Sequence, residues 1–257
     1  MRVGNVYIGE YLEKLKSIIL SINNNDIKKI TLDLLENPQL SFTLNKPLIQ
    51  LEESPAAPRK HHMFTSGLLV HTYSVVRVAL SLCSIFEEVY GVKVNRDLVI
   101  AAAILHDIFK YYQYTKDDKE GGYKTRDDWY LSHDYAIVAE LALRRAKDEL
   151  IRVVSEVHGV VPIKTFEGLI VHLADTIDAK FGEYIQNNAI ALIRELDNQN
   201  LKPYAILDEV IKSEGPKVLG LLAKDKEAFI DMVKNKFIKI PESREIKEAS
   251  NESKPSS

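Results

Sequence analysis

The sequence predicts an all-α fold, and three observations lead to this prediction. Hydrophobic residues recur at spacings of three and four along most of the 257-residue chain, which places them on one face of successive helices. Residues that favour helix ends stand before and after these segments. A single stretch in the middle of the chain, residues 111–129, departs from the helical pattern. We therefore expect a helical bundle with one short non-helical insertion.

The N-terminal part is expected to form two helices and a long connection. Helical spacing covers residues 6–22 and then residues 26–36, and Asn37-Pro38 ends this pair. The segment that follows, residues 38–60, is rich in proline. Since proline disfavours a helix interior, we expect this segment to lie extended across the core.

Two helices are predicted in the centre of the chain. The first covers residues 67–89, with Thr65 or Ser66 as the capping residue at its start and Gly91 at its end. Asn95 has the residue type that starts a helix, and the helix after it is hydrophobic on all sides. A helix without a polar face is expected to be buried.

The rest of the chain is predicted to be helical apart from the insertion. Within residues 111–129, Gly121-Gly122 lies between tyrosines and indicates a small hairpin or a mobile loop. Helices are expected at residues 132–147, 149–158 and 165–196, with two or three more over 203–236. The tail after Ile240 is rich in Glu, Lys and Ser, which is typical of disorder.

These elements predict one domain over residues 1–240. It would consist of an N-terminal helical pair and connection, a central core and C-terminal helices, with a disordered tail beyond it. The corresponding ranges are 1–60, 61–180, 181–240 and 241–257.

Composition limits the classes of protein that fit. Hydrophobic residues make up 46% and charged residues 28%, as in ordinary globular proteins. The formal net charge of −3 gives no electrostatic argument for nucleic acid, which is a possible partner but not the favoured one. No uninterrupted hydrophobic run reaches the length of a membrane span, and the chain opens without a signal-peptide pattern. We expect a cytoplasmic protein with no membrane partner.

The single cysteine, Cys83, narrows the chemistry further. One cysteine excludes an internal disulfide and a thiolate-rich metal cluster. Its position in a hydrophobic helical stripe predicts a small core residue rather than a reactive thiol. Any metal site must therefore be built from histidines and carboxylates.

The pair His106-Asp107 is the strongest chemical signal in the chain. It ends the hydrophobic run 98–105, so an imidazole and a carboxylate stand at the end of a buried helix. Such groups need partners, because an unpaired buried charge is strongly unfavourable, and a divalent cation would satisfy both. Four further candidate ligands stand on separate predicted segments: His71, His133, His158 and Asp175.

This ordered set, H…HD…H…H…D over residues 61–180, resembles the HD superfamily of metal-dependent phosphohydrolases. The resemblance implies an HD-domain helical bundle in which Asp107 bridges two metals. It also implies that His71 and Asp175 are ligands of the first metal. His133 and His158 stand where the two-metal branches of the family have their additional histidines. Imidazole and carboxylate ligands suit Fe, Mn, Zn, Co or Ni.

Lys110 and His62 are the candidate substrate contacts. Lys110 lies on the same helix face as Asp107, and the family often has HD-x-G-K there, with the lysine close to the substrate phosphate. In this chain Phe109 takes the glycine position. The alternative for Lys110 is a solvated charge at a helix end. His62 is the better candidate of the pair His61-His62, and the alternative is an ordinary loop histidine.

Two other polar residues are open to more than one interpretation. His172 stands one helical turn before Asp175 and is either a core histidine or an outer partner of a ligand. Asp178 lies one turn after Asp175 and competes with it as a ligand. The motif favours Asp175, which leaves Asp178 to cap a helix or to pair with a neighbour.

Two segments, 55–72 and 173–180, are similar to the HD domain of bacterial 3′-to-5′ exoribonucleases. Those enzymes hold RNA with an N-terminal OB-type barrel, whereas residues 1–45 are predicted to be helical here. The leading hypothesis is therefore a metal-dependent phosphohydrolase that uses a metal-activated water on a small phosphate ester. Candidates are a nucleotide, a cyclic nucleotide or a 2′,3′-cyclic phosphate, as in the archaeal dihydroneopterin cyclic-phosphate phosphodiesterases. An exoribonuclease and a non-hydrolytic module that binds metal and nucleotide are the alternatives.

The insertion at residues 111–129 is predicted to border the site and to select the substrate. It connects the HD helix to the segment of His133, and it carries tyrosines, Trp129 and cationic residues such as Arg126. Those side chains suit a flat ring and a phosphate. Acidic residues balance the charges, so a solvated connecting hairpin is the alternative.

Overall fold

The computed structural model describes residues 6–159, 161–196 and 202–237. The predicted disordered tail, residues 241–257, lies outside the described residues. Within them the fold is all-α, as predicted, with one small hairpin of β-strands. The longer helices are α1 Val6–Leu20, α2 Asn25–Glu36, α3 Gly67–Tyr90, α4 Arg96–Leu105, α5 His133–Leu143, α6 Asp148–Val157, α7 Phe166–Glu195, α8 Pro203–Glu214 and α10 Lys226–Phe237. The shorter elements are α9 Leu221–Lys224, β1 Tyr114–Lys116, β2 Tyr123–Thr125 and the 3₁₀ turns η1 Leu51–Glu53, η2 Lys110–Gln113 and η3 Pro216–Gly220.

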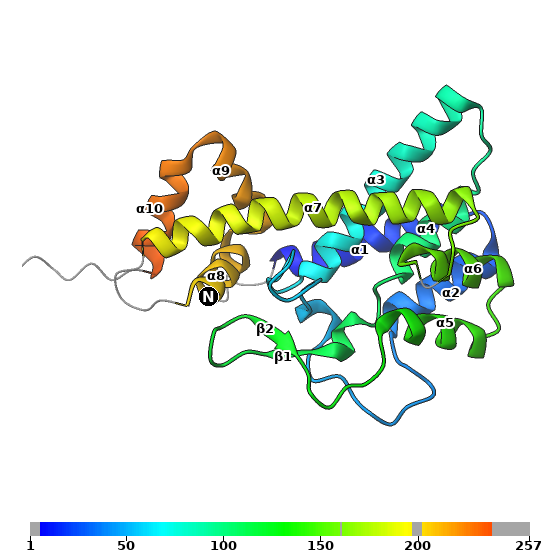
Figure 1. The fold of residues 1–257 in the computed structure, drawn as a ribbon, viewed down its shortest axis with the longest axis horizontal. Coiled ribbons are helices and arrows are strands. Elements are labelled where there is room, and N and C mark those ends of the chain that lie inside the picture. Colours follow the sequence, from blue (N-terminus) through cyan, green and yellow to red (C-terminus); the bar gives the residue numbers. More distant parts are fainter. Residues whose placement is uncertain (1–5, 160, 197–201, 238–257) are drawn as a thin grey trace, which may run out of the picture.

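Helix α7 is the longest helix in the described part of the chain. It has 30 residues, so it is about 45 Å long at the usual rise per residue. Figure 1 shows it crossing the whole molecule, with α1–α6 around one half and α8–α10 around the other. Each half has its own hydrophobic cluster, and the cluster of α1–α6 is the larger one.

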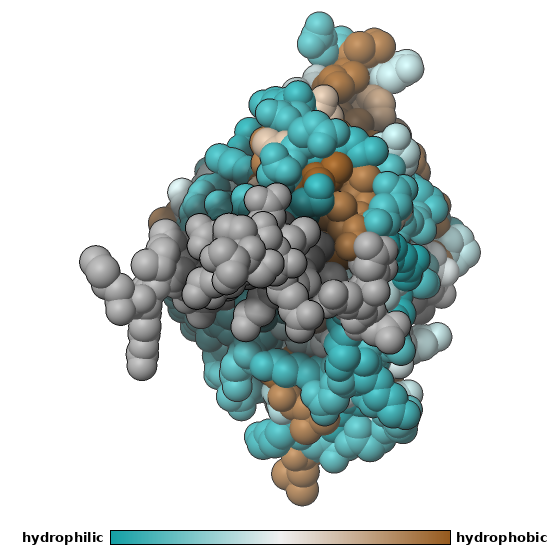
Figure 2. Space-filling view, turned by 90° about the vertical axis from the view of Figure 1, so that its left-hand side faces the viewer, coloured by the Kyte–Doolittle hydropathy of each residue, from teal (hydrophilic) through white to brown (hydrophobic). Residues whose placement is uncertain are grey.

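The C-terminal helices turn their hydrophobic residues towards α7. Leu207, Ile211 and Phe229 are fully buried there, against Ile193 of α7. Figure 2 views the molecule from this end, and the surface is mostly hydrophilic with a few hydrophobic patches. This half of the protein therefore has a core of its own at the far end of α7.

Helix α4 lies in the centre of the other half. All its residues from Leu98 to Leu105 are buried, and it packs against α2, α3, α6 and α7. The side chain of Asn95 accepts hydrogen bonds from the backbone N–H groups of Asp97 and Leu98, which confirms it as the cap. Because α4 ends at His106, its polar end opens in the middle of the core.

Helix α3 forms the next layer and shows one departure from the sequence analysis. Gly91 ends it in the left-handed conformation, as predicted, with φ +66°. At its start, the Ser66 side chain makes no capping hydrogen bond and donates instead to the carbonyl of Glu52. Thr65 bonds to Asp208 of α8. The two predicted capping side chains thus hold neighbouring elements together.

By length and composition, α3 is the one helix in the described part of the chain that passes as a membrane span, where the sequence analysis expects none. Of its most hydrophobic window, 44% is buried inside the protein. Core helices pass the same test, so this is weak support for a membrane span.

The insertion forms the predicted hairpin. Strands β1 and β2 pair antiparallel, with Tyr114 opposite Thr125. Gly121 and Gly122 have φ values of +78° and +72°, a conformation that disfavours residues with a Cβ. A Cβ at Gly121 would also lie 2.7 Å from the Cβ of Ala205, so the tip of the hairpin rests on α8.

Candidate metal centre

Asp107 is the centre of the candidate site. It follows α4, and its side chain is fully buried. The Asp107 Oδ2 atom lies 3.4 Å from Nε2 of His71 and 3.4 Å from Nε2 of His106. The Oδ1 atom lies 3.2 Å from Nε2 of His133 and 3.1 Å from Nε2 of His158. The two oxygens of one carboxylate thus face two separate pairs of imidazoles.

The first group consists of His71 from α3, His106 and Asp107 at the end of α4, and Asp175 from α7. One ligand atom of each lies within 4.8 Å of the others. The Asp175 Oδ1 atom is 3.1 Å from Nε2 of His71 and 3.8 Å from Nε2 of His106. Two imidazoles and two carboxylates around one point are a suitable donor set for a divalent cation.

The second group consists of Asp107, His133 and His158, whose ligand atoms also lie within 4.8 Å of one another. His133 is the first residue of α5, and His158 follows the last residue of α6. The structure therefore brings all six predicted ligands together from five helices. Their role as ligands stays a prediction, which the geometry fits.

Outer contacts orient the imidazoles of the first group. The Nδ1 atom of His106 donates to the carbonyl of Ala103 at 2.9 Å, and Nδ1 of His71 lies 2.7 Å from Oδ2 of Asp178. With Nδ1 protonated, Nε2 carries the lone pair that a metal requires. The buried Nε2 atoms of His71, His106 and His133 have no hydrogen-bond partner within the described ranges. Since buried polar atoms are normally satisfied, these nitrogens fit a cation.

The charges of the site suit a cation as well. Burial alone would raise the pKa of the Asp107 carboxyl, but His106, Lys110, His133 and His158 hold it well below its usual range. Burial would also raise the pKa of the Asp175 carboxyl, but His106 and His71 hold that pKa below its usual range. Both carboxyl groups are therefore ionised near neutral pH.

Lys110 stands directly beside these carboxylates. Its side chain is nearly buried, and Nζ lies 2.6 Å from Oδ2 of Asp107. Burial lowers the pKa of Lys110, but the Asp107 carboxylate outweighs it and raises the pKa above the usual value. The backbone of Phe109 has φ −97°, so the missing glycine of the family pattern costs no backbone strain here. A solvated charge at a helix end does not describe this lysine.

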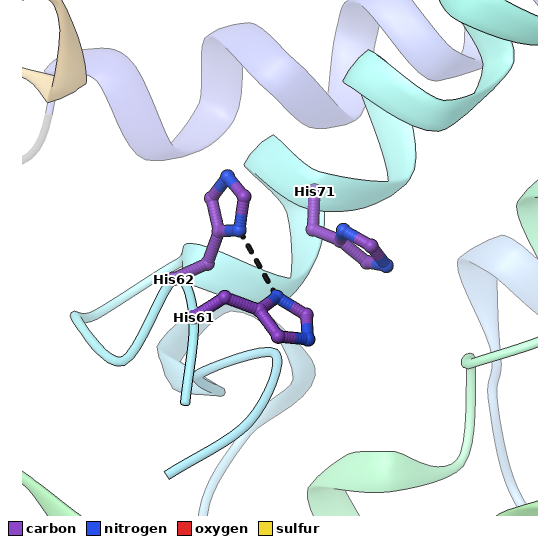
Figure 3. Close-up of side chains that lie close together, drawn as sticks. All are labelled: His61, His62 and His71. Atoms are coloured by element: carbon purple, nitrogen blue, oxygen red, sulfur yellow. Dashed lines mark hydrogen bonds between the residues drawn. The ribbon is translucent and has the colours of Figure 1, made fainter. Parts of the chain in front are cut away.

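Histidines 61 and 62 lie behind the first group. Figure 3 shows their rings side by side before α3, with His71 next to them. Their Nδ1 atoms are 3.2 Å apart, and Nε2 of His62 is 3.6 Å from Oδ2 of Asp178. Burial lowers the pKa of His61 to about 2 and the pKa of His62 to about 4, so both rings are neutral.

The trio His61, His62 and His71 also satisfies a distance test for a metal site. A hydrogen bond between the first two rings accounts for their close approach. Both nitrogens of His71 already face carboxylates, Asp178 on one side and Asp107 with Asp175 on the other. The trio therefore supports the first group and is a poor candidate for a further metal.

The two ambiguous residues have distinct positions. Nδ1 of His172 donates to the carbonyl of Val157 at 2.7 Å, which makes it a contact between α7 and the end of α6. Asp178 pairs with His71, as the sequence analysis expected for a residue that pairs nearby. One acidic neighbour of the site, Asp134, is missed by sequence reasoning, because acidic residues are common in the first turn of any helix.

The start of the insertion lies next to the site. Tyr114 is buried, and the charges of Lys110 and Asp107 influence its pKa, which burial raises to about 12. Further along, Arg126 pairs with Asp128 at 2.6 Å, and Trp129 packs on Tyr112 at 5.1 Å between ring centroids. These contacts favour the connecting hairpin over a loop that offers its rings and charges to a substrate. Substrate selection by residues 111–129 stays a prediction.

Comparison with known proteins identifies the family. The model of the HD domain matches residues 68–180, the range that contains all six predicted ligands. The chain is 33% identical over 236 residues to the dihydroneopterin 2′,3′-cyclic phosphate phosphodiesterase of Methanocaldococcus jannaschii. This match covers 84% of the chain and 94% of the relative. The chain belongs to the HD-domain family. This confirms the resemblance predicted from the sequence, and HD domains bind divalent metals.

Other HD-domain relatives match a smaller part. The chain is 29% identical over 188 residues to the 3′-5′ exoribonuclease YhaM of Shouchella clausii and 28% identical over 185 residues to that of a Geobacillus species. Each match covers 66% of this chain, but only 53% and 52% of the exoribonucleases. The chain thus spans about half the length of these relatives. No solved structure matches the chain significantly.

Proposed function

We propose that this metal-dependent phosphohydrolase opens a 2′,3′-cyclic phosphate of a small molecule, and that it uses two divalent cations of the Fe, Mn, Zn, Co or Ni class. The observation that carries the proposal is the Asp107 carboxylate, whose two oxygens face two separate groups of ligands. The substrate class rests on the phosphodiesterase relative, which the chain matches over 94% of the relative's length.

The first group would hold one cation and the second group the other, with Asp107 between them. Divalent cations supply positive charge for a phosphate and lower the pKa of water, which makes a nucleophile near neutral pH. In the reaction, the oxygen of water bonds to phosphorus, one P–O ester bond of the ring breaks, and the released oxygen takes up a proton. The product is a phosphomonoester.

Lys110 would bind the phosphate. Its ammonium group lies at the same carboxylate that links the two groups, in a buried position where charges interact strongly. A positive charge fixed at this point would stabilise the extra negative charge of the transition state. The substrate contact predicted for His62 stays a prediction, since its ring is buried between His61 and Asp178.

A substrate panel tests the proposed function. The protein would be loaded with each candidate metal and offered a pterin 2′,3′-cyclic phosphate, 2′,3′- and 3′,5′-cyclic nucleotides, phosphomonoesters and short RNA. We expect preferred opening of 2′,3′-cyclic phosphates. Shortening of RNA alone would support the exoribonuclease alternative, and bound metal without any hydrolysis would support the non-hydrolytic module.

The Asp107→Ala variant is the control for this panel. It removes the carboxylate common to both groups, so we expect loss of metal and of turnover. Breaking a buried charge cluster also costs about 3–5 kcal/mol, so its folding must be checked by circular dichroism. Asp148→Ala is the matched variant, because Asp148 is an exposed acidic residue in the first turn of α6. Full turnover by a folded Asp107→Ala protein would contradict the proposal.

A further inference from the structure

Asp134 lies beside the second group of ligands. Its Oδ1 atom is 3.2 Å from Nε2 of His133 and 3.6 Å from Nε2 of His158. The same two nitrogens also face Oδ1 of Asp107. The carboxylates of Asp107 and Asp134 therefore share one pair of imidazoles.

The orientation of Asp134 is fixed by its other oxygen. The hydroxyl of Ser132 donates to Oδ2 at 2.6 Å, so Oδ1 is left to face the two histidines. This Oδ1 atom is buried and has no hydrogen-bond partner in the part of the chain that the structure describes. A buried carboxylate oxygen without a partner is costly unless another group satisfies it.

A hydrogen bond to His133 does not satisfy it. Nε2 of His133 is equally far, 3.2 Å, from Oδ1 of Asp107 and Oδ1 of Asp134, and it is itself without a hydrogen-bond partner among the described residues. One ring nitrogen can carry only one proton, so it cannot serve both carboxylates. A cation between them would satisfy the imidazole and both oxygens at once.

The two groups of ligands also differ by one donor. The first has two imidazoles, one oxygen of Asp107 and a carboxylate of its own, Asp175. The second, as predicted from the motif, has two imidazoles and the other oxygen of Asp107. Four protein donors are common around a divalent ion, and Asp134 would supply the fourth.

We propose that Asp134 is a direct ligand of the cation in the second group, together with Asp107, His133 and His158. Its function is to hold that cation with a carboxylate that belongs to this group alone, as Asp175 belongs to the first. The proposal rests on the proposed binuclear centre.

Metal content measures this role without any substrate. Metal-free protein would be titrated with Co²⁺, and bound metal would be followed by isothermal titration calorimetry and by the visible absorption of bound Co²⁺. We expect two equivalents in the native protein. In Asp134→Asn the first equivalent should bind unchanged, while the second should bind at least about tenfold more weakly and with an altered spectrum.

Two further variants make the test decisive. His133→Ala should lose the second equivalent. Asp148→Asn removes an exposed acid from the next helix and should bind like the native protein. Two equivalents of native affinity and spectrum in Asp134→Asn, with the second lost in His133→Ala, would overturn the role of Asp134. A single equivalent in the native protein would overturn it as well. Failure of the substrate panel leaves these binding results unaffected, so the two proposals fail separately.

Discussion

At the scale of single residues, the site depends on how its side chains divide their atoms between neighbours. Asp107 offers one oxygen to each group of histidines. His71 and His106 each use Nδ1 for an outer contact, which leaves Nε2 for the centre. Replacing an outer partner such as Asp178 would therefore change the orientation of a predicted ligand, His71.

Lys110 gives the first prediction at this scale. Lys110→Met keeps the length and removes the charge, so we expect metal content to stay and kcat to fall about a hundredfold, because one charge at the phosphate is lost. Lys93→Met, in the exposed connection between α3 and α4, is the control and should have native kinetics. Steady-state kinetics on the best cyclic phosphate decide it, and native kcat in Lys110→Met would refute a role in phosphate binding.

Sequence reasoning at the residue scale was limited by local ambiguity. His106-Asp107 is recognisable because an imidazole and a carboxylate end a hydrophobic helix, where a functional site is the most plausible reason for them. Asp134 is also a carboxylate next to a histidine in the sequence. It stands in the first turn of a helix, however, where acidic residues are common without any functional role. Its contact with His158 joins residues 24 positions apart, which no local pattern reveals.

At the scale of elements, close approach between α7 and the segment before α3 holds the histidines in place. Gly182 of α7 allows this approach, because a Cβ there would lie 2.4 Å from Cε1 of His62. The His62 ring is buried and rigid, so it cannot move aside as the end of a flexible side chain could. The position of His62 therefore depends on a glycine of another element.

Substitution of this glycine gives the second prediction. In Gly182→Ala the clash should outweigh the better helix propensity of alanine, with a net loss of about 1–2 kcal/mol and a Tm about 2–8 °C lower. Gly220→Ala is the matched control, since its Cβ would meet nothing within 4 Å and its φ is −64°. Thermal unfolding by circular dichroism measures both. A Tm of Gly182→Ala at or above that of the native protein would show that the ring moves freely.

The elements themselves were largely predictable, and their ends less so. The hydrophobic run of α4 with its Asn95 cap, and Gly91 at the end of α3, follow from local rules and are confirmed. The predicted helix 132–147 ends at Leu143, because the chain turns at Arg145 with φ +57°. Ser66 bonds to a distant carbonyl instead of capping. In both cases tertiary contacts and backbone turns override the local preference.

At the scale of the whole molecule, the candidate centre ties five helices together. The six predicted ligands come from α3, α5, α6 and α7 and from the end of α4, all in the half of the protein with the larger core. Since the two groups form only when these helices are assembled, metal bound there would stabilise the folded state. The far half, α8–α10, has a core of its own and no predicted ligand.

Metal removal gives the third prediction. At a free metal concentration a hundred times the dissociation constant, one bound ion adds about 2.7 kcal/mol to the free energy of unfolding. For a protein of this size we expect a chelator to lower Tm by about 5–10 °C, and added Mn²⁺ or Co²⁺ to restore it. Differential scanning fluorimetry measures the shift, with Asp107→Ala as the variant that should not respond. The same shift in Asp107→Ala would place the stabilising metal elsewhere.

The central claim is that one carboxylate, Asp107, joins two metal positions. Anomalous diffraction from a crystal of the protein loaded with Mn²⁺ tests it most directly. The account predicts two peaks, one next to Oδ2 among His71, His106 and Asp175 and one next to Oδ1 between His133 and His158. A single peak, or two peaks of which at most one lies next to Asp107, would contradict it.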